Sequence, residues 1–242
     1  PQRLMPGVPA LPAARAMPAW FELPDGSGRL QLWPHKAAFD PELGLLLVAD
    51  AHLGKAVSFR RLGVPVPEAT TGAALARLDD LLAATGARGI VFLGDLLHSA
   101  RAHAAGTMAT LAAWRARHAA LALTLVRGNH DAHAGDPPAS LGVQVVDGPL
   151  RLGPWALLHQ PGAVAGAYAL AGHLHPGAVV GGRGGDRLRL PCFHFGAALG
   201  VLPAFGPFTG LQVLPATPGV QRYVVAGELV RALPVLAPPL RG

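Results

Sequence analysis

The chain has 242 residues, a length typical of one large α/β domain with a continuous core. Hydrophobic residues make up 51% of the chain and charged residues only 14%, yet no uninterrupted apolar stretch is long enough to cross a bilayer, so the composition excludes a helical membrane protein. The formal net charge of +6 favours an anionic partner such as a nucleic acid, although codon bias toward Ala, Gly, Pro and Arg would also produce it.

The two ends of the chain are rich in proline. We expect residues 1–20 to form a flexible leader, because four prolines interrupt every apolar core that a signal peptide would need. Residues 234–242 are expected to form a flexible tail, and residues 21–233 a single domain. The one cysteine, Cys192, cannot form an internal disulfide, which agrees with a reducing, cytoplasmic location.

Between these ends, short apolar runs alternate with helical patterns, as in βαβ units around a buried sheet. Residues 45–49 and 90–93 predict strands buried on both faces. Between them we expect a helix that begins at Thr70 or Thr71 and ends at Gly86, because its leucines recur at helical spacing. A second helix is expected over about residues 107–118.

The second half of the chain predicts mostly strands. Residues 121–126, 155–158 and 168–171 are apolar runs that each end in a polar cluster. Beyond residue 178 the helical patterns stop, and glycines separate short strand-like segments, including 187–190, 211–214 and 223–225. A second, mainly antiparallel sheet fits this pattern.

Five polar clusters follow the apolar runs, each at the point where a strand should end. Ligands gather at the carboxyl ends of strands in α/β sheets, so loops distant in sequence can converge there on one pocket. The clusters are Asp50-Ala51-His52, Gly94-Asp95, Gly128-Asn129-His130-Asp131, Leu158-His159 and Gly172-His173-Leu174-His175.

Carboxylate, imidazole and amide groups without sulfur suit divalent Mn, Fe or Zn. Each histidine alone would more often be a surface or core residue, but the joint pattern favours metal binding. Seven candidate ligands are too many for one ion, and two ions sharing a carboxylate would use them all, with Asp95 as the natural bridge. The candidates are Asp50, His52, Asp95, Asn129, His159, His173 and His175.

The series of clusters resembles the signature of the calcineurin-like metallophosphoesterase superfamily, D-x-H, G-D, G-N-H-D/E, H and G-H-x-H, in that order. The resemblance implies a four-layer α/β/β/α sandwich with two facing mixed sheets. It also implies two metal positions that share Asp95. The first would use Asp50, His52, Asp95 and His175, and the second Asp95, Asn129, His159 and His173.

By the same resemblance, His130 would face the substrate rather than a metal. A hydroxide bridging the metals would attack phosphorus in line, and His130 would protonate the leaving alkoxide. Asp131 either orients His130 or is a cap or turn residue. Arg127 either grips a phosphate oxygen or pairs with a neighbouring loop.

Segments outside the metal signature resemble one bacterial subfamily, the ligase-associated DNA damage response endonucleases (PdeM). The resemblance covers about residues 30–233 and rests on residues 50–67, on 94–99 and on 190–210. It implies manganese as the productive metal and endonucleolytic cleavage of DNA that is single-stranded or has unpaired regions. A DNA ligase, a helicase and an exonuclease would be functional partners. His98, Arg60 and Arg61 are candidate DNA contacts, with Lys55 nearby, and all four could equally be ordinary surface or loop residues.

Three rival functions fit the same metal ligands. A pyrophosphatase acting on a UDP-linked lipid A precursor would need an apolar acyl pocket and often a membrane-facing helical cap, and no basic amphipathic insertion of that kind is present. A generic phosphomonoesterase would differ only in substrate. A binding scaffold without metals would usually have lost ligands, whereas all seven are present here.

Overall fold

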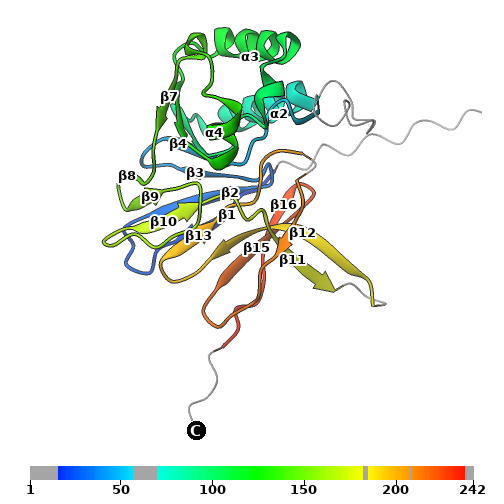
Figure 1. Cartoon of the computed structure of the whole chain (residues 1–242). Helices are drawn as coiled ribbons and strands as arrows, with labels where there is room; N and C mark the ends of the chain where they lie inside the picture. The colour runs from blue at the N-terminus through cyan, green and yellow to red at the C-terminus, as the bar shows by residue number, and fades with distance from the viewer. Residues whose placement is uncertain (1–15, 57–69, 182–184, 208, 238–242) are drawn as a thin grey trace, which may run out of the picture.

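The computed structural model describes residues 16–56, 70–181, 185–207 and 209–237 (Figure 1). Two β-sheets lie face to face, and helices cover the outer side of the first sheet (Figure 1). Both sheets contain parallel and antiparallel pairs, so the predicted α/β class with two facing mixed sheets is confirmed.

The first sheet has seven strands in chain order. They are β1 (Ala19–Glu22), β2 (Arg29–Trp33), β3 (Ala37–Asp40), β4 (Leu45–Ala49), β5 (Gly89–Leu93), β6 (Ala122–Val126) and β7 (Val143–Val146). Strands β1 to β4 pair antiparallel, whereas β4 to β7 pair parallel. Parallel strands end at one edge, so the segments that follow β4, β5 and β6 meet there.

Three α-helices pack on the outer face of this sheet: α2 (Thr70–Thr85), α3 (Ala105–Arg117) and the short α4 (Asn129–Ala134). Leu75, Leu78 and Leu81 of α2 are buried against the sheet, as their helical spacing requires. Two 3₁₀ turns, Ala100–His103 and Ala139–Leu141, complete this layer. Both predicted helices therefore form within about two residues of the expected bounds. None of the described helices combines the length and the apolar character needed to cross a membrane.

The second sheet has nine strands, and its central path runs β14-β11-β12-β13-β10-β9-β8. Strand β10 lies between β9 and β13 and is parallel to both, and the long β12 also pairs with β15. The strands are β8 (Leu150–Leu152), β9 (Trp155–Leu157), β10 (Tyr168–Ala171), β11 (Pro176–Gly181), β12 (Arg187–Phe195), β13 (Leu199–Val201), β14 (Gln212–Val213), β15 (Gln221–Ala226) and β16 (Leu229–Ala232).

One hydrophobic core lies between the two sheets, and a second, larger one lies between the first sheet and its helices. Phe21 of β1 stacks on Phe195 of β12 with ring centroids 3.9 Å apart, which joins the sheets directly. Trp155 of β9 is buried, and its indole Nε1–H donates a hydrogen bond of 2.7 Å to Oδ2 of Asp40, the last residue of β3. Burial of a large side chain such as Trp155 stabilises the fold by about 1.5–3 kcal/mol. The two sheets thus form one rigid support for the loops at their edges.

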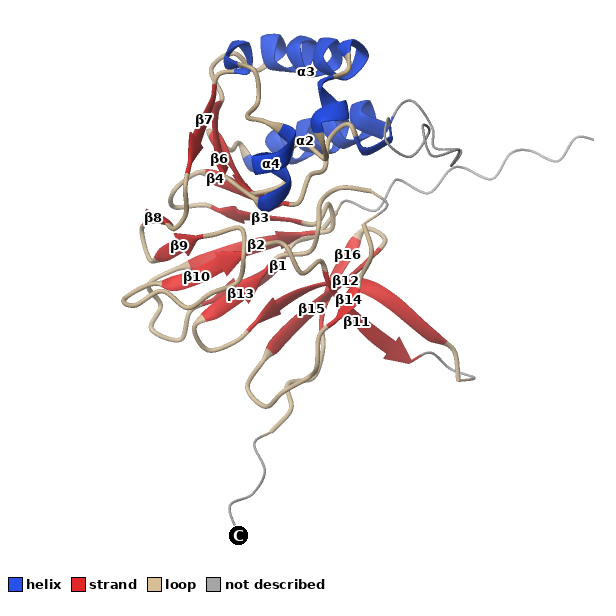
Figure 2. Cartoon of the chain, in the orientation of Figure 1, coloured by secondary structure: helices blue, strands red, loops and turns tan. Residues whose placement is uncertain are grey.

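The layers differ from the expected sandwich in one respect. Every described helix lies on the side of the first sheet, and none covers the outer face of the second (Figure 2). That face instead carries a small apolar cluster of Ala178, Cys192 and Val224. In the described part of the chain the arrangement is therefore three layers, α/β/β, because the sequence beyond residue 146 forms strands joined by turns and contains no helix.

The described residues extend slightly beyond the expected domain limits. Strand β1 includes Ala19 and Trp20, and Met17 forms an isolated parallel bridge with Leu229. Near the other end, the carbonyl of Leu236 accepts a hydrogen bond from the Gly219 amide at 3.2 Å. Parts of the expected leader and tail therefore belong to the fold, while residues 1–15 and 238–242 lie outside the described ranges.

Candidate metal centre

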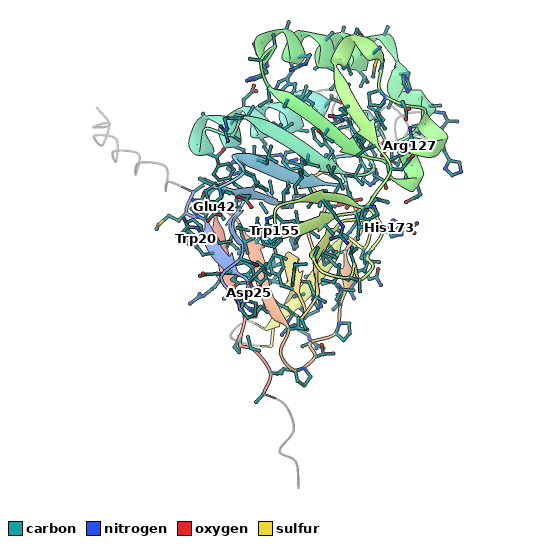
Figure 3. All side chains as sticks on the ribbon, turned by 90° about the vertical axis from the view of Figure 1, so that its left-hand side faces the viewer. Trp20, Asp25, Glu42, Arg127, Trp155 and His173 are labelled. Atoms are coloured by element: carbon teal, nitrogen blue, oxygen red, sulfur yellow. The ribbon has the colours of Figure 1, made fainter. Side chains whose placement is uncertain are left out.

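The seven predicted ligands converge where strands of the two sheets end. Asp50 and His52 follow β4, Asp95 follows β5, Asn129 follows β6, His159 follows β9, and His173 and His175 follow β10. In Figure 3, His173 and Arg127 lie on one side of the molecule, opposite Trp20 and Asp25. One shared site at the strand ends is therefore formed, as the clusters predict.

The first group of ligand atoms belongs to Asp50, His52 and His175, and all of these atoms lie within 4.8 Å of one another. The Nε2 atoms of the two histidines are 3.4 Å apart. Oδ1 of Asp50 lies 3.7 Å from Nε2 of His175. Two imidazoles and a carboxylate thus surround one point.

The second group belongs to Asp95, His159 and His173, again within 4.8 Å of one another. Nε2 of His159 lies 3.0 Å from Nδ1 of His173 and 2.7 Å from Oδ1 of Asn129. Nδ1 of His159 donates its proton to the Leu93 carbonyl at 3.0 Å, because a carbonyl can only accept. The lone pair of Nε2 is therefore directed at the group, which is the usual way in which a protein orients a metal-binding histidine.

Asp95 belongs to the second group and also faces the first. Its Oδ1 lies 3.5 Å from Nε2 of His159 in the second group, and its Oδ2 lies 3.9 Å from Nε2 of His52 in the first. Each carboxylate oxygen therefore faces a different group. This geometry fits the bridging role predicted for Asp95.

The donor atoms fit two divalent cations. Imidazole nitrogens held 2.0–2.1 Å from one ion at angles of about 90–109° lie roughly 3.0–3.4 Å apart, and the two histidine pairs here are 3.4 and 3.0 Å apart. Oδ1 of Asp50 is buried and has no hydrogen-bond partner in the structure. A buried carboxylate oxygen without a donor is costly unless a cation is bound beside it. The oxygen and nitrogen donors suit Mn, Fe or Zn.

The backbone of the ligands is held in an unfavourable conformation. Among the described residues, six that are not glycine have a positive φ, and five of these are ligands. For such residues the left-handed region costs roughly 1–2 kcal/mol each. The cost is typical of a functional site, where the surrounding structure fixes the geometry. The five are Asp50 (50°), His52 (45°), Asp95 (51°), His173 (69°) and His175 (46°).

Two motif glycines allow the loops to approach this closely. A Cβ on Gly172 would lie 2.6 Å from Oδ2 of Asp50, and one on Gly128 would overlap Oδ1 of Asp95. Both carboxylates instead accept backbone hydrogen bonds in that space: Asp50 from the His173 amide and Asp95 from the His130 amide, each at 2.9 Å. Glycine at these positions is therefore a packing requirement of the site.

Burial keeps several of the histidines in the form that binds metals. It lowers the pKa of His52 to about 2, with the charge of Lys55 adding to the effect. Burial also lowers the pKa of His173, and it lowers that of His98 to about 4. A neutral imidazole with a free lone pair is the form that coordinates a cation.

His130 lies beside the two groups without belonging to either. Its side chain is 44% exposed, and its Nε2 is 3.9 Å from Oδ2 of Asp95. Its Nδ1 donates to the carbonyl of His98 at 3.2 Å, and the two rings stack with centroids 5.5 Å apart. The ring of His98 also meets the ring of His52 edge-on, at 5.4 Å. His130 and His98 therefore lie next to the ligand groups, and contact of either ring with a substrate stays a prediction.

Asp131 does not contact the His130 ring. Its buried carboxylate accepts backbone hydrogen bonds of 2.7–3.3 Å from the amides of Asp95, Leu96, Leu97 and Gly128. Burial raises its pKa, while these amides act in the opposite direction. Of the two interpretations offered by the sequence, the structure favours the cap and turn role, and the suggestion that Asp131 orients His130 is corrected.

Arg127 pairs with two carboxylates instead of standing free. Its Nη2 lies 2.9 Å from Oδ2 of Asp136, and its Nη1 lies 2.6 Å from Oδ1 of Asp147. The structure therefore favours the loop-pairing alternative over the phosphate grip. Arg127 nevertheless borders a hollow of about 250 Å³ beside Asn129 and His159. The candidate DNA contacts Arg60 and Arg61 lie outside the described residues.

Four cationic residues near the site had no signal in the sequence. Lys36 and Arg77 donate hydrogen bonds to the carbonyls of Gly206 and Phe205, next to the segment that carries Asp50. Arg187 and Arg189 are exposed on β12, in the hairpin that begins directly after the ligand His175. Lys36 and Arg77 depend on partners more than a hundred residues away in the sequence, whereas Arg187 and Arg189 lie in a local hairpin and belong to no motif.

Comparison with known proteins identifies the family. No family model and no curated protein matches the sequence. Among solved structures, the crystal structure of Pseudomonas putida nuclease MPE matches with a TM-score of 0.79 and 42% identity, over 89% of this chain and 100% of that one. YfcE, a phosphoesterase from E. coli, matches with a TM-score of 0.39 and 15% identity, over 79% of this chain and 99% of that one. With 42% identity along the whole of the nuclease and paired Asp and His groups at the strand ends, the chain belongs to the calcineurin-like metallophosphoesterases.

Proposed function

We propose that this metallophosphoesterase is a DNA endonuclease that uses two manganese ions and acts in DNA repair. The observation that carries the proposal is the pair of adjacent ligand groups, with Asp95 lying between them and the partly exposed His130 beside them. The similarity to a bacterial nuclease supports the nucleic-acid substrate. The repair role and the choice of manganese rest on the resemblance of residues 50–67, 94–99 and 190–210 to the ligase-associated endonucleases.

When bound, two divalent cations supply a nucleophile from water at neutral pH and offset the charge of the phosphate. Among the described residues the ligand groups contain two carboxylates, Asp50 and Asp95, so the site would keep a positive charge that attracts a phosphodiester. His130 then supplies the proton. With Nδ1 held on the His98 carbonyl, a protonated His130 presents Nε2–H to the leaving oxygen. The half-exposed ring can reach a substrate, whereas the buried ligands cannot.

A basic hairpin beside the site supports a long anionic substrate. Strand β11 begins one residue after His175, and its partner β12 places Arg189 opposite Val179 and Arg187 opposite Gly181. Every second residue of a strand lies on the same face of the sheet, so both arginines lie on the face of β12 that carries Phe193. Phe193 belongs to the core between the two sheets. The two arginines lie about 13 and 20 Å along the hairpin from the ligand. In the described part of the chain neither forms an ion pair, so both can contact phosphates beyond the scissile bond.

The rival substrates have less support. An acylated lipid needs an apolar pocket, but the hollow beside Asn129 and His159 has a mixed lining that includes Arg127 and Gln160. An apolar cavity between the helices and the first sheet has only about 30 Å³ of free space, too little for an acyl chain. A phosphomonoester would make no use of the hairpin. A scaffold without metals is disfavoured because all seven ligand residues are present and converge.

A nuclease assay on single-stranded circular DNA tests the proposal, since only an endonuclease can cut a strand without ends. Purified, metal-free protein is supplied with manganese, magnesium, iron or zinc in turn, and the Asp95→Asn variant serves as the inactive control. Linear products in manganese support the proposal. Intact circles with every metal, together with turnover of a UDP-linked lipid or of a phosphomonoester, would contradict it.

The contribution of the hairpin is measured by DNA affinity. The double variant Arg187→Ala/Arg189→Ala should bind single-stranded DNA more weakly. Its affinity should also fall less steeply with salt concentration, by the amount expected for the loss of about two phosphate contacts. The variant Arg29→Ala/Arg88→Ala is the matched control, because it removes the same charge at the amino ends of β2 and β5. These ends lie on the side of the sheet away from the ligands. Equal losses in both variants would show that only net charge matters.

A further inference from the structure

A short segment after β13 packs directly on the backbone of the ligand Asp50. The Phe205 amide donates to the Ala49 carbonyl at 2.8 Å, and the Gly206 amide donates to the Asp50 carbonyl at 3.0 Å. A Cβ on Gly206 would lie only 2.6 Å from the Ala51 carbonyl oxygen. Because Asp50 has a positive φ of 50°, the direction of its carbonyl is set by this contact and not by its own preference.

Two cationic side chains hold that segment from the other side. Arg77 of α2 donates through Nη2 to the Phe205 carbonyl at 2.8 Å, and its guanidinium lies 4.2 Å from the centre of the Phe205 ring. Lys36, in the turn between β2 and β3, donates through Nζ to the Gly206 carbonyl at 3.1 Å. Both partners are more than a hundred residues away in the sequence. We call this arrangement, Lys36 and Arg77 on residues 205–206, the cation clamp.

The clamp is costly, which argues that it does more than fill space. Burial, together with the nearby charge of Arg77, lowers the pKa of Lys36 to about 7. Burial lowers the pKa of Arg77 as well. In the described part of the chain no carboxylate forms an ion pair with either cation. Two like charges are thus desolvated together, and only backbone carbonyls and one aromatic ring compensate them.

We propose that Lys36 and Arg77 are positioning residues that hold Asp50 in its left-handed conformation and thereby shape the first metal group. The Asp95 loop and His159 are held differently. Asp131 binds the backbone of the Asp95 loop, and the Leu93 carbonyl fixes the His159 ring. Loss of the clamp therefore affects the position formed by Asp50, His52 and His175 more than the other one. The proposal concerns metal binding and is independent of which phosphodiester is the substrate.

The test measures manganese binding to the metal-free full chain, without substrate. The variant Lys36→Met/Arg77→Met keeps the apolar stems and removes both donors. Arg88→Met is the control, since Arg88 also donates to a backbone carbonyl, that of Leu43, but at the far end of the sheet. We expect the double variant to lose roughly 10–100-fold in manganese affinity at the first group, as is usual when a partner of a metal ligand is removed. The second group should lose less, since it contacts Asp50 through the His173 amide, and the control should be unchanged.

Spectroscopy assigns the loss to a group. Electron paramagnetic resonance distinguishes a coupled manganese pair from an isolated ion, and a crystal structure with anomalous scattering shows which group remains occupied. An isolated ion at Asp95, His159 and His173 supports the proposal. A coupled pair with the affinity of the parent protein, or equal weakening of both groups, would overturn it.

A milder variant guards against misfolding. If circular dichroism shows that the double variant is unfolded, Arg77→Lys takes its place, because lysine keeps one donor at that position. The proposal then requires an intermediate loss of affinity, confined to the first group. A fully folded Arg77→Lys protein with parental affinity, alongside unchanged binding in Arg77→Met, would equally refute it.

Discussion

Backbone positions with a positive φ occur at both ends of the parallel strands, but different residue types occupy them at the two ends. At the amino ends, the left-handed positions before β4 and β9 are occupied by glycines, Gly44 (φ 65°) and Gly153 (φ 56°). At the carboxyl ends, aspartate and histidine take that conformation after β4, β5 and β10. Glycine adopts a positive φ at little cost, while other residues are destabilised. Among the described residues, unfavourable backbone geometry is therefore concentrated at the candidate metal ligands, and Lys36 is the one other non-glycine residue that adopts it.

The most damaging change to the carboxyl-end site should be Asp95→Asn. The amide keeps the size of the side chain but lacks the charge and the second anionic oxygen that faces the other group. We expect the rate of diester cleavage to fall by roughly 10³-fold or more, and fewer than two manganese ions to bind. Hydrolysis of a small diester and metal analysis of the same sample measure both effects. Two firmly bound ions in this variant would rule out the bridge.

The next largest effect is expected from His130→Ala, which removes the proposed proton donor without touching a ligand. The chemical step should slow by about 10²–10⁴-fold, whereas both manganese ions should remain. A substrate with a strongly acidic leaving group needs no proton donor, so its hydrolysis should be much less affected. Loss of a metal from this variant would show that His130 acts as a ligand after all.

A pair of glycine substitutions compares the two ends directly. Gly172→Ala places a methyl group 2.6 Å from Oδ2 of Asp50, so it should displace that ligand and weaken metal binding and activity together. Gly153→Ala meets nothing closer than 3.8 Å and adds only the cost of its positive φ. That cost is about 1–2 kcal/mol of stability. Thermal unfolding and activity assays on both variants separate the effects, and equal activity in the two would refute the comparison.

The effect that lies furthest from catalysis concerns pH and Lys36. Its pKa falls from 10.5 to about 7 on folding, so between these values the unfolded chain holds more protons than the folded one. The free energy of unfolding should therefore rise with pH across this window, and below about pH 7 the contribution should no longer change. Urea unfolding of the metal-free protein and of Lys36→Met at pH 7 and pH 9.5 isolates it. The free energy of unfolding of the parent protein minus that of Lys36→Met should be larger at pH 9.5 than at pH 7. A decrease in this quantity would have the wrong sign.

Much of the site is predictable from sequence because its ligands sit in short motifs directly after apolar strands. The strands at residues 45–49 and 168–171 form with the expected bounds, and the seven ligands converge as their placement requires. The antiparallel edge formed by β1 to β3 was not predicted, although β2 alternates polar and apolar residues, because β1 and β3 are only four residues long. The helical layer expected on the second sheet came from the resemblance and is not found among the described residues.

What the sequence could not supply are interactions between side chains and distant backbone. Asp131 looks like a partner for its neighbour His130, but its oxygens are occupied by amides 34 to 36 residues away. Arg127 looks free, but Asp136 and Asp147 reach it across loops. Lys36 and Arg77 carry no motif at all. Such contacts follow from the fold, and no local pattern encodes them.

The four amides bound by Asp131 have a consequence for how the protein acquires its cations. They fasten the loop of Asp95 to the turn that carries Asn129 and His130, so these segments move as one body. Opening that body would expose a buried carboxylate and leave its amide partners without acceptors. Metal exchange should therefore proceed through rotation of individual side chains at the exposed face. Hydrogen exchange of the Leu96 and Leu97 amides should then stay slow even in protein stripped of its ions.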